Sequence, residues 1–287
     1  MLICQALRRA EDSLLRSGVL SPRLDAEVLL SEILRCDRAF LLGHPEAPLS
    51  AEAEEILGVW VERRSRGLPV AYILGKKEFW SLEFMVTPAV LIPRPETELL
   101  VEASMQMAER GEKEEAIAEV GCGSGAVVVS LARELREGEF YASDASADAL
   151  WVARQNAIRH GVAERISFLR GDLLGAFAGR GMEGKLDQIL ANPPYIPSSD
   201  ICQLPREIRL YEPKQALNGG KDGLSVYRRL IPEARRFLKP GGWLVLEMGE
   251  GQGEAISGLL AGSRGFEEVK IFRDYRGIDR VISARRG

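Results

Sequence analysis

From residue 116 onward, short apolar segments of strand type alternate with segments of helix type, and this alternation limits the possible folds more than any other feature. Such alternation predicts an α/β domain with a mainly parallel sheet covered on both faces. A terminal antiparallel hairpin is expected around Asp274-Tyr275-Arg276-Gly277. The expected strands are residues 117–120, 140–143, 166–169, 186–191 and 243–248, followed by the hairpin strands 269–272 and 281–283.

Residues 1–67 have a different, helical periodicity. Ser21-Pro22 is expected to cap one helix, Ser50 is expected to cap another, and Gly67 is expected to end the latter. Residues 70–90 are expected to be extended pieces joined by turns, and the charged stretch 110–115 to be a surface connection. We therefore expect an N-terminal helical docking domain (residues 1–67), an extended or hairpin linker (68–90) and a larger α/β domain (91–287).

The composition, with 46% hydrophobic and 28% charged residues, is that of a soluble globular protein. No apolar run approaches the ~20 residues that a membrane span needs, and the N-terminus lacks the apolar core of a signal peptide. We therefore expect a cytoplasmic protein that is not associated with a membrane. The four cysteines have no zinc spacing and the two histidines stand alone, so no metal site is predicted. A net charge of -4 argues against direct nucleic-acid binding.

A glycine-rich loop lies between the first expected strand of the α/β domain and its helix. Glycines at alternate positions let a backbone turn sharply and approach a ligand closely beside a helix N-terminus. Asp144 ends the second strand, where a carboxylate can accept both hydroxyls of a ribose, and Asp172-Leu173 follows the third strand, where they could meet an adenine. This pattern predicts an adenosine site and leaves NAD and S-adenosylmethionine open. The candidate loop residues are Glu119, Gly121, Cys122, Gly123, Ser124 and Gly125.

The tetrapeptide Asn192-Pro193-Pro194-Tyr195 follows the fourth strand, at the edge where open α/β sheets bind ligands. An amide nitrogen is a poor nucleophile, so an enzyme that methylates it must fix the NH2 group and accept its hydrogen bonds as positive charge develops. The Asn192 side-chain oxygen and the Pro193 carbonyl are two such acceptors, Pro194 stiffens the loop, and Tyr195 offers a flat face to a planar group. The tetrapeptide therefore favours methyl transfer from S-adenosylmethionine over an NAD-dependent reaction.

With these residues, the chain resembles the HemK/PrmC family of release-factor glutamine N5-methyltransferases over nearly its whole length. The most specific match is the segment Arg94-Pro95-Glu96-Thr97-Glu98 joined to a helical N-terminal domain. Further matches are Gly75-Lys76-Lys77-Glu78-Phe79-Trp80, Glu212-Pro213 and Lys239-Pro240-Gly241-Gly242 before a strand ending Glu247-Met248-Gly249. Glu119 and Leu173 depart from the common pattern, where an Asp and an aromatic residue are frequent. Arg94 and Glu96 could be tethers between domains or part of the active-site rim.

The resemblance implies a seven-stranded, Rossmann-like methyltransferase fold over residues 91–287. It implies S-adenosylmethionine as donor, S-adenosylhomocysteine as product, and the glutamine of the GGQ loop of peptide-chain release factors as acceptor. Gly121, Gly123 and Gly125 would then cradle the cofactor, Asp144 would hold its ribose, and Asp172 with Leu173 would meet its adenine. Residues 192–195 would hold the substrate amide, and we expect a monomer.

The main alternative function is an adenine N6-methyltransferase acting on DNA or RNA, because such enzymes share the Asn-Pro-Pro-Tyr tetrapeptide. Base flipping normally calls for a basic groove and a target-recognition region. Residues 1–80 hold 11 Lys and Arg against 12 Asp and Glu, so the N-terminal domain is not a basic annex. A non-catalytic binding module would be expected to lack Asn192 or the glycines, and both are present.

Overall fold

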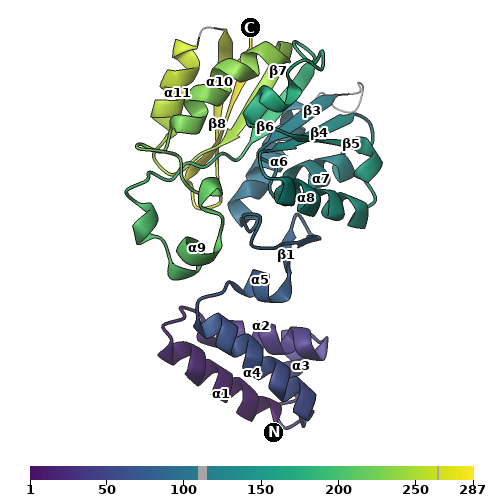
Figure 1. Cartoon of the computed structure of the whole chain (residues 1–287), viewed down its shortest axis with the longest axis vertical. Coiled ribbons are helices and arrows are strands. Elements are labelled where there is room, and N and C mark those ends of the chain that lie inside the picture. The colour runs from purple at the N-terminus through teal and green to yellow at the C-terminus, as the bar shows by residue number, and fades with distance from the viewer. Residues whose placement is uncertain (109–114, 264) are drawn as a thin grey trace. The chain divides into compact units, whose positions relative to one another are not determined.

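The computed structural model describes residues 1–108, 115–263 and 265–287 (Figure 1). Most of the expected surface connection at 110–115 lies outside the described residues. The chain divides into two compact units. The first unit comprises Met1–Lys76 and Pro205–Tyr211, and the second comprises Lys77–Leu204 and Glu212–Gly287.

The first unit is helical, as the periodicity predicted. Its apolar core is formed by side chains such as Leu7, Leu14, Leu29 and Leu57, all buried. The helices are α1 (Ile3–Arg16), α2 (Pro22–Leu34), α3 (Arg38–Gly43), α4 (Ala51–Ser65), α5 (Val70–Leu74) and α9 (Arg206–Tyr211).

The two expected helix caps behave differently. The Ser50 hydroxyl accepts a hydrogen bond from the Ala53 amide at 3.1 Å, so the prediction for α4 is confirmed. Ser21 precedes α2 without capping it, because its hydroxyl donates instead to the Asp25 carboxylate at 2.9 Å. Pro22 is the first residue of α2, where its missing N–H costs nothing.

A buried arginine joins α9 to the rest of the first unit. Arg64 of α4 pairs with Asp25 of α2 at 2.6 Å and with Glu207 of α9 at 2.5 Å. The Tyr211 hydroxyl also donates to the Arg66 carbonyl at 3.0 Å. The segment Pro205–Tyr211 therefore belongs to the helical unit, although it follows the Asn-Pro-Pro-Tyr tetrapeptide in the sequence.

The expectation of extended structure is wrong for Val70–Leu74, which form α5. Pro69 provides a hydrogen-bond acceptor at the start of this short helix, Ile73 is buried in the core, and Gly75 ends the helix with a left-handed φ of 71°. β-Branched residues such as Val70 and Ile73 are typical of strands, but here tertiary packing buries Ile73 and partly buries Val70. The expected hairpin follows as β1 (Lys76–Phe79) and β2 (Leu82–Met85), joined by Trp80 and Ser81 with positive φ.

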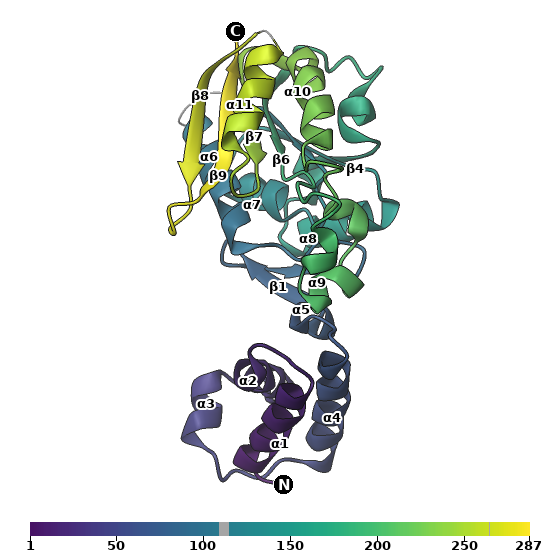
Figure 2. The same cartoon turned by 90° about the vertical axis from the view of Figure 1, so that its left-hand side faces the viewer.

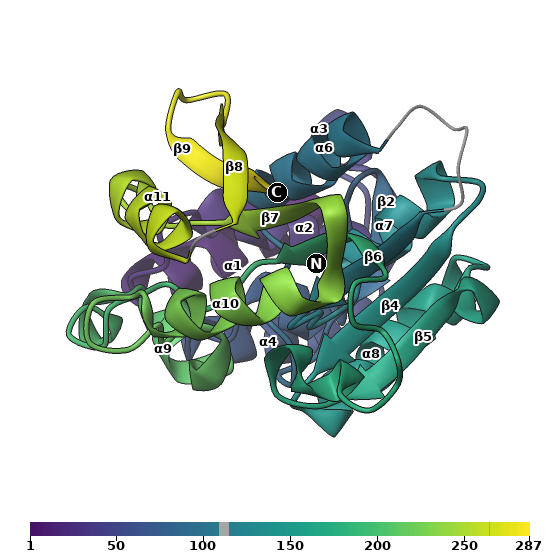
Figure 3. The ribbon, with the colours of Figure 1, turned by 90° about the horizontal axis from the view of Figure 1, so that it is seen from above.

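The second unit contains a sheet of seven strands in the described residues, in the order β5-β4-β3-β6-β7-β9-β8 (Figure 3). β9 is antiparallel to both of its neighbours and forms the predicted terminal hairpin with β8, whereas the other pairs are parallel. The mainly parallel α/β prediction is confirmed. The strands are β3 (Ala116–Val120), β4 (Glu139–Asp144), β5 (Ile166–Arg170), β6 (Leu186–Ala191), β7 (Leu238–Glu247), β8 (Phe266–Arg273) and β9 (Asp279–Arg286).

Helices cover both faces of this sheet (Figure 2). Side chains of α6, α7 and α8 pack on one face with Ile117 and Leu190, whereas α10, α11 and η3 pack on the other with Ala118 and Ile189. Neighbouring residues of one strand thus point to opposite cores. The helices are α6 (Glu98–Met107), α7 (Ala126–Glu134), α8 (Ala147–Arg159), α10 (Ser225–Phe237) and α11 (Gly253–Gly262), with 3-10 turns η1 (Pro95–Thr97), η2 (Ala163–Arg165), η3 (Leu173–Phe177), η4 (Ile201–Gln203) and η5 (Lys214–Ala216).

Within residues 1–108, 115–263 and 265–287, no helix is both long enough and apolar enough to cross a membrane. The same residues hold no cluster of three or more His, Cys, Asp or Glu side chains that could bind a metal ion.

Candidate active site

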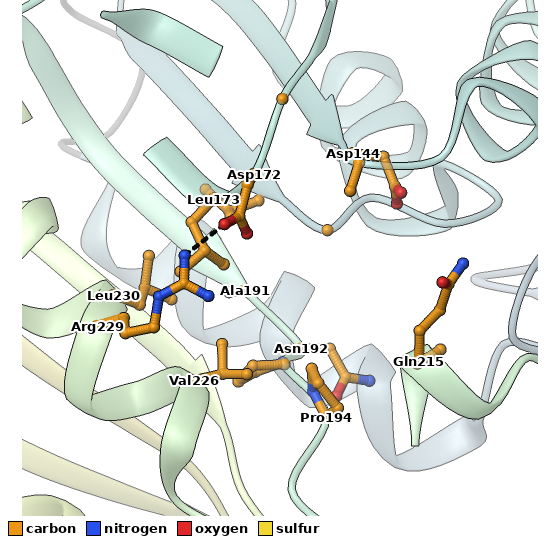
Figure 4. A pocket seen from close by; sticks show the side chains of 16 residues that line it. Asp144, Asp172, Leu173, Ala191, Asn192, Pro194, Gln215, Val226, Arg229 and Leu230 are labelled. Carbon is orange, nitrogen blue, oxygen red and sulfur yellow. Dashed lines mark hydrogen bonds and ion pairs between the residues drawn. The ribbon is translucent and has the colours of Figure 1, made fainter. Parts of the chain in front are cut away.

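A pocket of about 270 Å³ opens at the carboxyl ends of β3, β4, β5 and β6 in the second unit (Figure 4). This is the edge where open α/β sheets bind ligands. The volume approaches the lower end of small-molecule pockets, roughly 300 Å³. The residues that line it and were predicted from the sequence are Gly121, Asp144, Asp172, Leu173, Asn192, Pro193 and Pro194.

The glycines of the loop after β3 serve two different purposes. Gly121 and Gly123 have φ values of 72° and 53°, and a Cβ on either would point into open space. Gly125 also has a left-handed φ, but a Cβ there would lie 2.9 Å from Cβ of Ala153 in α8. Gly125 is thus required for helix packing, whereas the space beside Gly121 and Gly123 suits a ligand that approaches the backbone closely.

Asp144 lies at the pocket with its carboxylate already oriented. One carboxylate oxygen accepts from the Gly123 amide at 3.0 Å, and the other accepts from the Ser146 amide at 2.8 Å. Each oxygen retains a further lone pair. The carboxylate can therefore accept two ligand hydroxyls without moving, which fits a ribose.

Three predicted loop residues lie behind the pocket rather than in it. Glu119 is buried and accepts a hydrogen bond from the Val128 amide at 2.9 Å, and its burial raises the pKa of the carboxyl to about 8. Burial also raises the pKa of the Cys122 thiol well above its usual value, so this thiol is unreactive. The Ser124 carbonyl accepts from Asn156 of α8 at 2.9 Å. These residues fix the loop from its inner side.

Asp172 forms an ion pair with Arg229 of α10 across the pocket (Figure 4). Both side chains are more than half exposed, and exposed pairs contribute ~0–1 kcal/mol, so a ligand can displace the arginine from Asp172. Leu173 takes a left-handed φ of 49°, which is uncommon for a branched residue. Together with Val226 and Leu230 it forms an apolar wall that suits a flat ring.

Asn192 leaves the end of β6 and lines the pocket. Its side-chain NH2 donates to the Thr97 hydroxyl of η1 at 3.2 Å. Because Thr97 holds the nitrogen, the amide oxygen of Asn192 is left as an acceptor. The fold thus brings the Arg-Pro-Glu-Thr-Glu segment and the Asn-Pro-Pro-Tyr tetrapeptide into contact, although Thr97 and Asn192 are 95 residues apart in the sequence.

Tyr195 does not line the pocket but fixes the loop. Its carbonyl accepts from the Gln252 side chain at 3.0 Å, and a Cβ on Gly223 would lie only 2.3 Å from the same carbonyl oxygen. Burial, with the nearby Glu247 carboxyl, raises the pKa of the Tyr195 hydroxyl to about 12, so the phenol stays protonated around neutral pH.

Arg94 is a structural contact in the second unit. Its guanidinium donates to the Glu212 carboxylate at 2.5 Å, and the same carboxylate accepts from the Ile92 amide at 3.4 Å. Glu212 is buried and Arg94 is not among the residues that line the pocket. Glu96 is partly buried and also lies outside the lining.

Sequence reasoning missed part of the pocket. Gln215 and Ala216 come from η5; the resemblance to the family included Glu212-Pro213 and Ala216-Leu217 but assigned these residues no role, and Gln215 was not singled out. Arg229 lies on the amphipathic helix α10 and carries no local signal. The remaining lining residues are Val120, Ala145, Gly171, Ala191, Val226 and Leu230.

Comparison with known proteins gives consistent matches along the chain. The family described as PrmC N-terminal domain matches residues 5–75, and the family described as methyltransferase small domain matches residues 95–204. A release factor glutamine methyltransferase of Moorella thermoacetica is 43% identical over 286 residues, which covers 100% of this chain and 99% of the relative. A protein of the same name from Geobacter sulfurreducens is 40% identical and covers 96% and 93% of the two chains.

A solved structure supports the fold. The crystal structure of a methyltransferase from Pyrococcus furiosus is similar with a TM-score of 0.53, covering 74% of this chain and 92% of that chain. Its sequence is 20% identical, so the likeness shows the methyltransferase fold alone. The predicted seven-stranded methyltransferase fold with an N-terminal helical domain is confirmed.

Proposed function

The chain belongs to the family of release factor glutamine methyltransferases, and we propose that it transfers the methyl group of S-adenosylmethionine to a glutamine amide nitrogen held by Asn192. One observation supports Asn192 as the site of this reaction. Its side-chain NH2 donates a hydrogen bond to Thr97 at 3.2 Å, which leaves the amide oxygen as an acceptor at the pocket. The acceptor we propose is the glutamine of the GGQ loop of a peptide-chain release factor.

The residues around the pocket fit S-adenosylmethionine. Open space beside Gly121 and Gly123 admits the cofactor next to the backbone, and the Asp144 carboxylate has free lone pairs for its ribose hydroxyls. Leu173 would cover one face of the adenine, and Asp172 would accept its amino group once Arg229 moves aside. When bound, the cofactor supplies an electrophilic methyl group.

The chain's own contribution to the reaction is the placement of the substrate amide. The amide oxygen of Asn192 accepts one N–H of the glutamine side chain, and the Pro193 carbonyl accepts the other. Two acceptors fix the NH2 group and stabilise the positive charge that develops on it. Proline residues at 193 and 194 restrict φ, and Gln252 holds the Tyr195 carbonyl, so the acceptors need little reorganisation.

A release factor is a protein of the translation apparatus, so we propose that the enzyme acts in the cytoplasm. One chain supplies the pocket, the tetrapeptide and the residues that hold them, which supports a monomer as the active form. The helical unit is proposed to bind the body of the factor while the glutamine reaches Asn192.

The test is to incubate the enzyme with radiolabelled S-adenosylmethionine and a purified release factor. A factor whose GGQ glutamine is replaced by alanine and an Asn192→Ala enzyme serve as controls, and calorimetry checks that the variant enzyme still binds the cofactor. Label on the wild-type factor alone is expected. Absence of label on the factor, with label on DNA or RNA offered in parallel, would support adenine N6-methylation instead.

A further inference from the structure

Glu247 is a buried carboxyl immediately beside Asn192. β6 and β7 are parallel neighbours with Ala191 opposite Leu246, so Asn192, which follows β6, and Glu247, the last residue of β7, lie side by side. Glu247 is only 2% exposed. The polar side chains of Thr97 and Asn192 face its carboxyl group and lower its pKa. Glu247 and Thr97 are therefore buried beside Asn192, which itself lines the pocket.

The Glu247 side chain does not serve the local backbone. The main chain there is held by other groups, because the Tyr227 hydroxyl donates to the Glu247 carbonyl at 2.7 Å and the Met248 amide donates to the Arg280 carbonyl at 2.8 Å. Within the residues that the structure describes, Oε2 of Glu247 is buried without a hydrogen-bond partner. A buried carboxyl oxygen without a hydrogen-bond partner destabilises the fold, so packing alone gives no reason for a glutamate here.

Charged and titratable groups on several neighbouring elements surround the Glu247 carboxyl group. Arg280 of β9 is the facing cation, but its guanidinium is also paired with Asp274 at 3.1 Å. Glu98 of α6 binds the Trp80 amide instead. Burial, opposed by Thr97, Arg280 and Asn192, raises the pKa of the Glu247 carboxyl to about 7. The other groups that face it are Glu96 of η1, Tyr195 of the loop and Tyr227 of α10.

A carboxylate in this position acts on the substrate through Asn192. The side chain of Asn192 is neutral, yet its oxygen must stabilise positive charge on the glutamine amide. A negative group close to the NH2 of Asn192 polarises the whole amide and makes its oxygen a stronger acceptor, an effect that low dielectric enhances. The hydrogen bond from the Asn192 NH2 to the Thr97 hydroxyl restrains the amide against rotation.

We propose that Glu247 is a positioning residue for methyl transfer, whose carboxylate, with Thr97, orients and polarises Asn192 so that the asparagine oxygen faces the substrate amide. This inference rests on the proposed function of the Asn192 site. The tetrapeptide has no charged side chain. In this proposal the negative charge comes from Glu247, at the end of the neighbouring strand β7. Glu247 itself is not among the residues that line the pocket.

The test compares full-length wild-type enzyme, Glu247→Gln and Glu250→Gln in single-turnover methylation of a release factor between pH 6 and 8.5. Glu250 is exposed and three residues away, so Glu250→Gln makes the same chemical change without the cluster. Glu247→Gln keeps the shape of the side chain and removes its charge. Calorimetry with S-adenosylmethionine and circular dichroism are run on all three proteins.

The wild-type rate should fall about tenfold from pH 8 to pH 6, because a carboxylate with a pKa of about 7 is lost as pH falls. Glu247→Gln should be ten- to a hundredfold slower at pH 8, with no such pH dependence, a KM for the factor within threefold of wild type and unchanged cofactor affinity. Glu250→Gln should match wild type.

Two results would overturn the inference. One is a Glu247→Gln rate and pH profile equal to those of the wild type. The other is a loss of cofactor binding or folding together with activity, which would give Glu247 a structural role. Failure of the proposed function is separate, because in that case the wild-type enzyme itself would leave the release factor unlabelled.

Discussion

Replacing Glu119 by glutamine should remove a pH-dependent loss of stability from the methyltransferase unit. Glu119 is 4% exposed and its one hydrogen bond in the described residues is accepted from the Val128 amide. Burial raises the pKa of the carboxyl from 4.5 to about 8, and the nearby Asp144 charge adds to this. The folded protein therefore binds a proton at Glu119 that the unfolded chain has already released at neutral pH.

The sign and size follow from this difference. Because the folded state binds more protons than the unfolded state between pH 4.5 and pH 8, the free energy of unfolding falls as pH rises through this range. Each pH unit contributes at most about 1.4 kcal/mol, so the full effect is on the order of 5 kcal/mol above pH 8. Below pH 4.5 the group contributes no penalty.

The glutamine introduced by Glu119→Gln would carry one N–H more than the protonated acid, which costs ~1–3 kcal/mol at every pH if it finds no acceptor. The informative quantity is therefore how the difference between variant and wild type changes with pH. Urea unfolding followed by circular dichroism at pH 5, 7 and 9 measures it. Glu119→Gln should gain several kcal/mol relative to wild type between pH 5 and pH 9, whereas the exposed Glu164→Gln should change by less than about 0.5 kcal/mol. A difference for Glu119→Gln that is the same at pH 5 and pH 9 would refute the reasoning.

Two further pairs of substitutions test the buried ion pair of the helical unit and the glycine loop of the second unit. Arg64→Met should destabilise the helical unit by about 3–5 kcal/mol in urea unfolding, because it leaves the buried Asp25 without its cation. Arg63→Met, at the exposed neighbouring residue, should be nearly neutral. Equal effects of the two substitutions would argue against a stabilising role of the buried ion pair. Gly125→Ala and Gly123→Ala both place alanine at a left-handed φ, but only the former creates a clash, with Ala153. Gly125→Ala should therefore lower stability by about 1–3 kcal/mol more, and Gly123→Ala should chiefly weaken cofactor binding in calorimetry; the reverse order would contradict the division of roles.

The strands of the second unit were predictable because their signals are local. Each predicted strand lies within the observed one or overruns its end by one residue, since apolar runs bounded by turn residues leave few alternatives at that length. Asp144 could be placed at the pocket because the carboxyl ends of parallel strands share one edge. Prediction failed for α5, where Val70 and Ile73 resemble a strand and tertiary packing makes a helix.

The missed site residues have a different cause. Arg229 lies in the pocket because α10 packs on the sheet face that meets η3, and no residue near Arg229 in sequence reports this. Likewise, the pairing of Arg64 with Glu207 depends on a return of the chain after 143 residues, which periodicity does not encode. Contacts between distant segments, and not the motifs, determine these positions.

The position of Asn192 illustrates how much of the chain one short motif requires. Its nitrogen is held by Thr97, which is 95 residues earlier, while the carbonyl three residues on at Tyr195 is held by Gln252, 57 residues later. Asparagine and proline residues alone would leave the amide of residue 192 free to rotate, and the two ends of a rotated amide have opposite hydrogen-bonding character. The tetrapeptide thus specifies the chemical groups, but their orientation comes from η1, from the loop before α11 and from the end of β7. A protein that carried the tetrapeptide without a hydroxyl at the position of Thr97 would lose the hydrogen bond that holds the nitrogen of Asn192, which is why the Arg-Pro-Glu-Thr-Glu segment and the tetrapeptide have to be interpreted together.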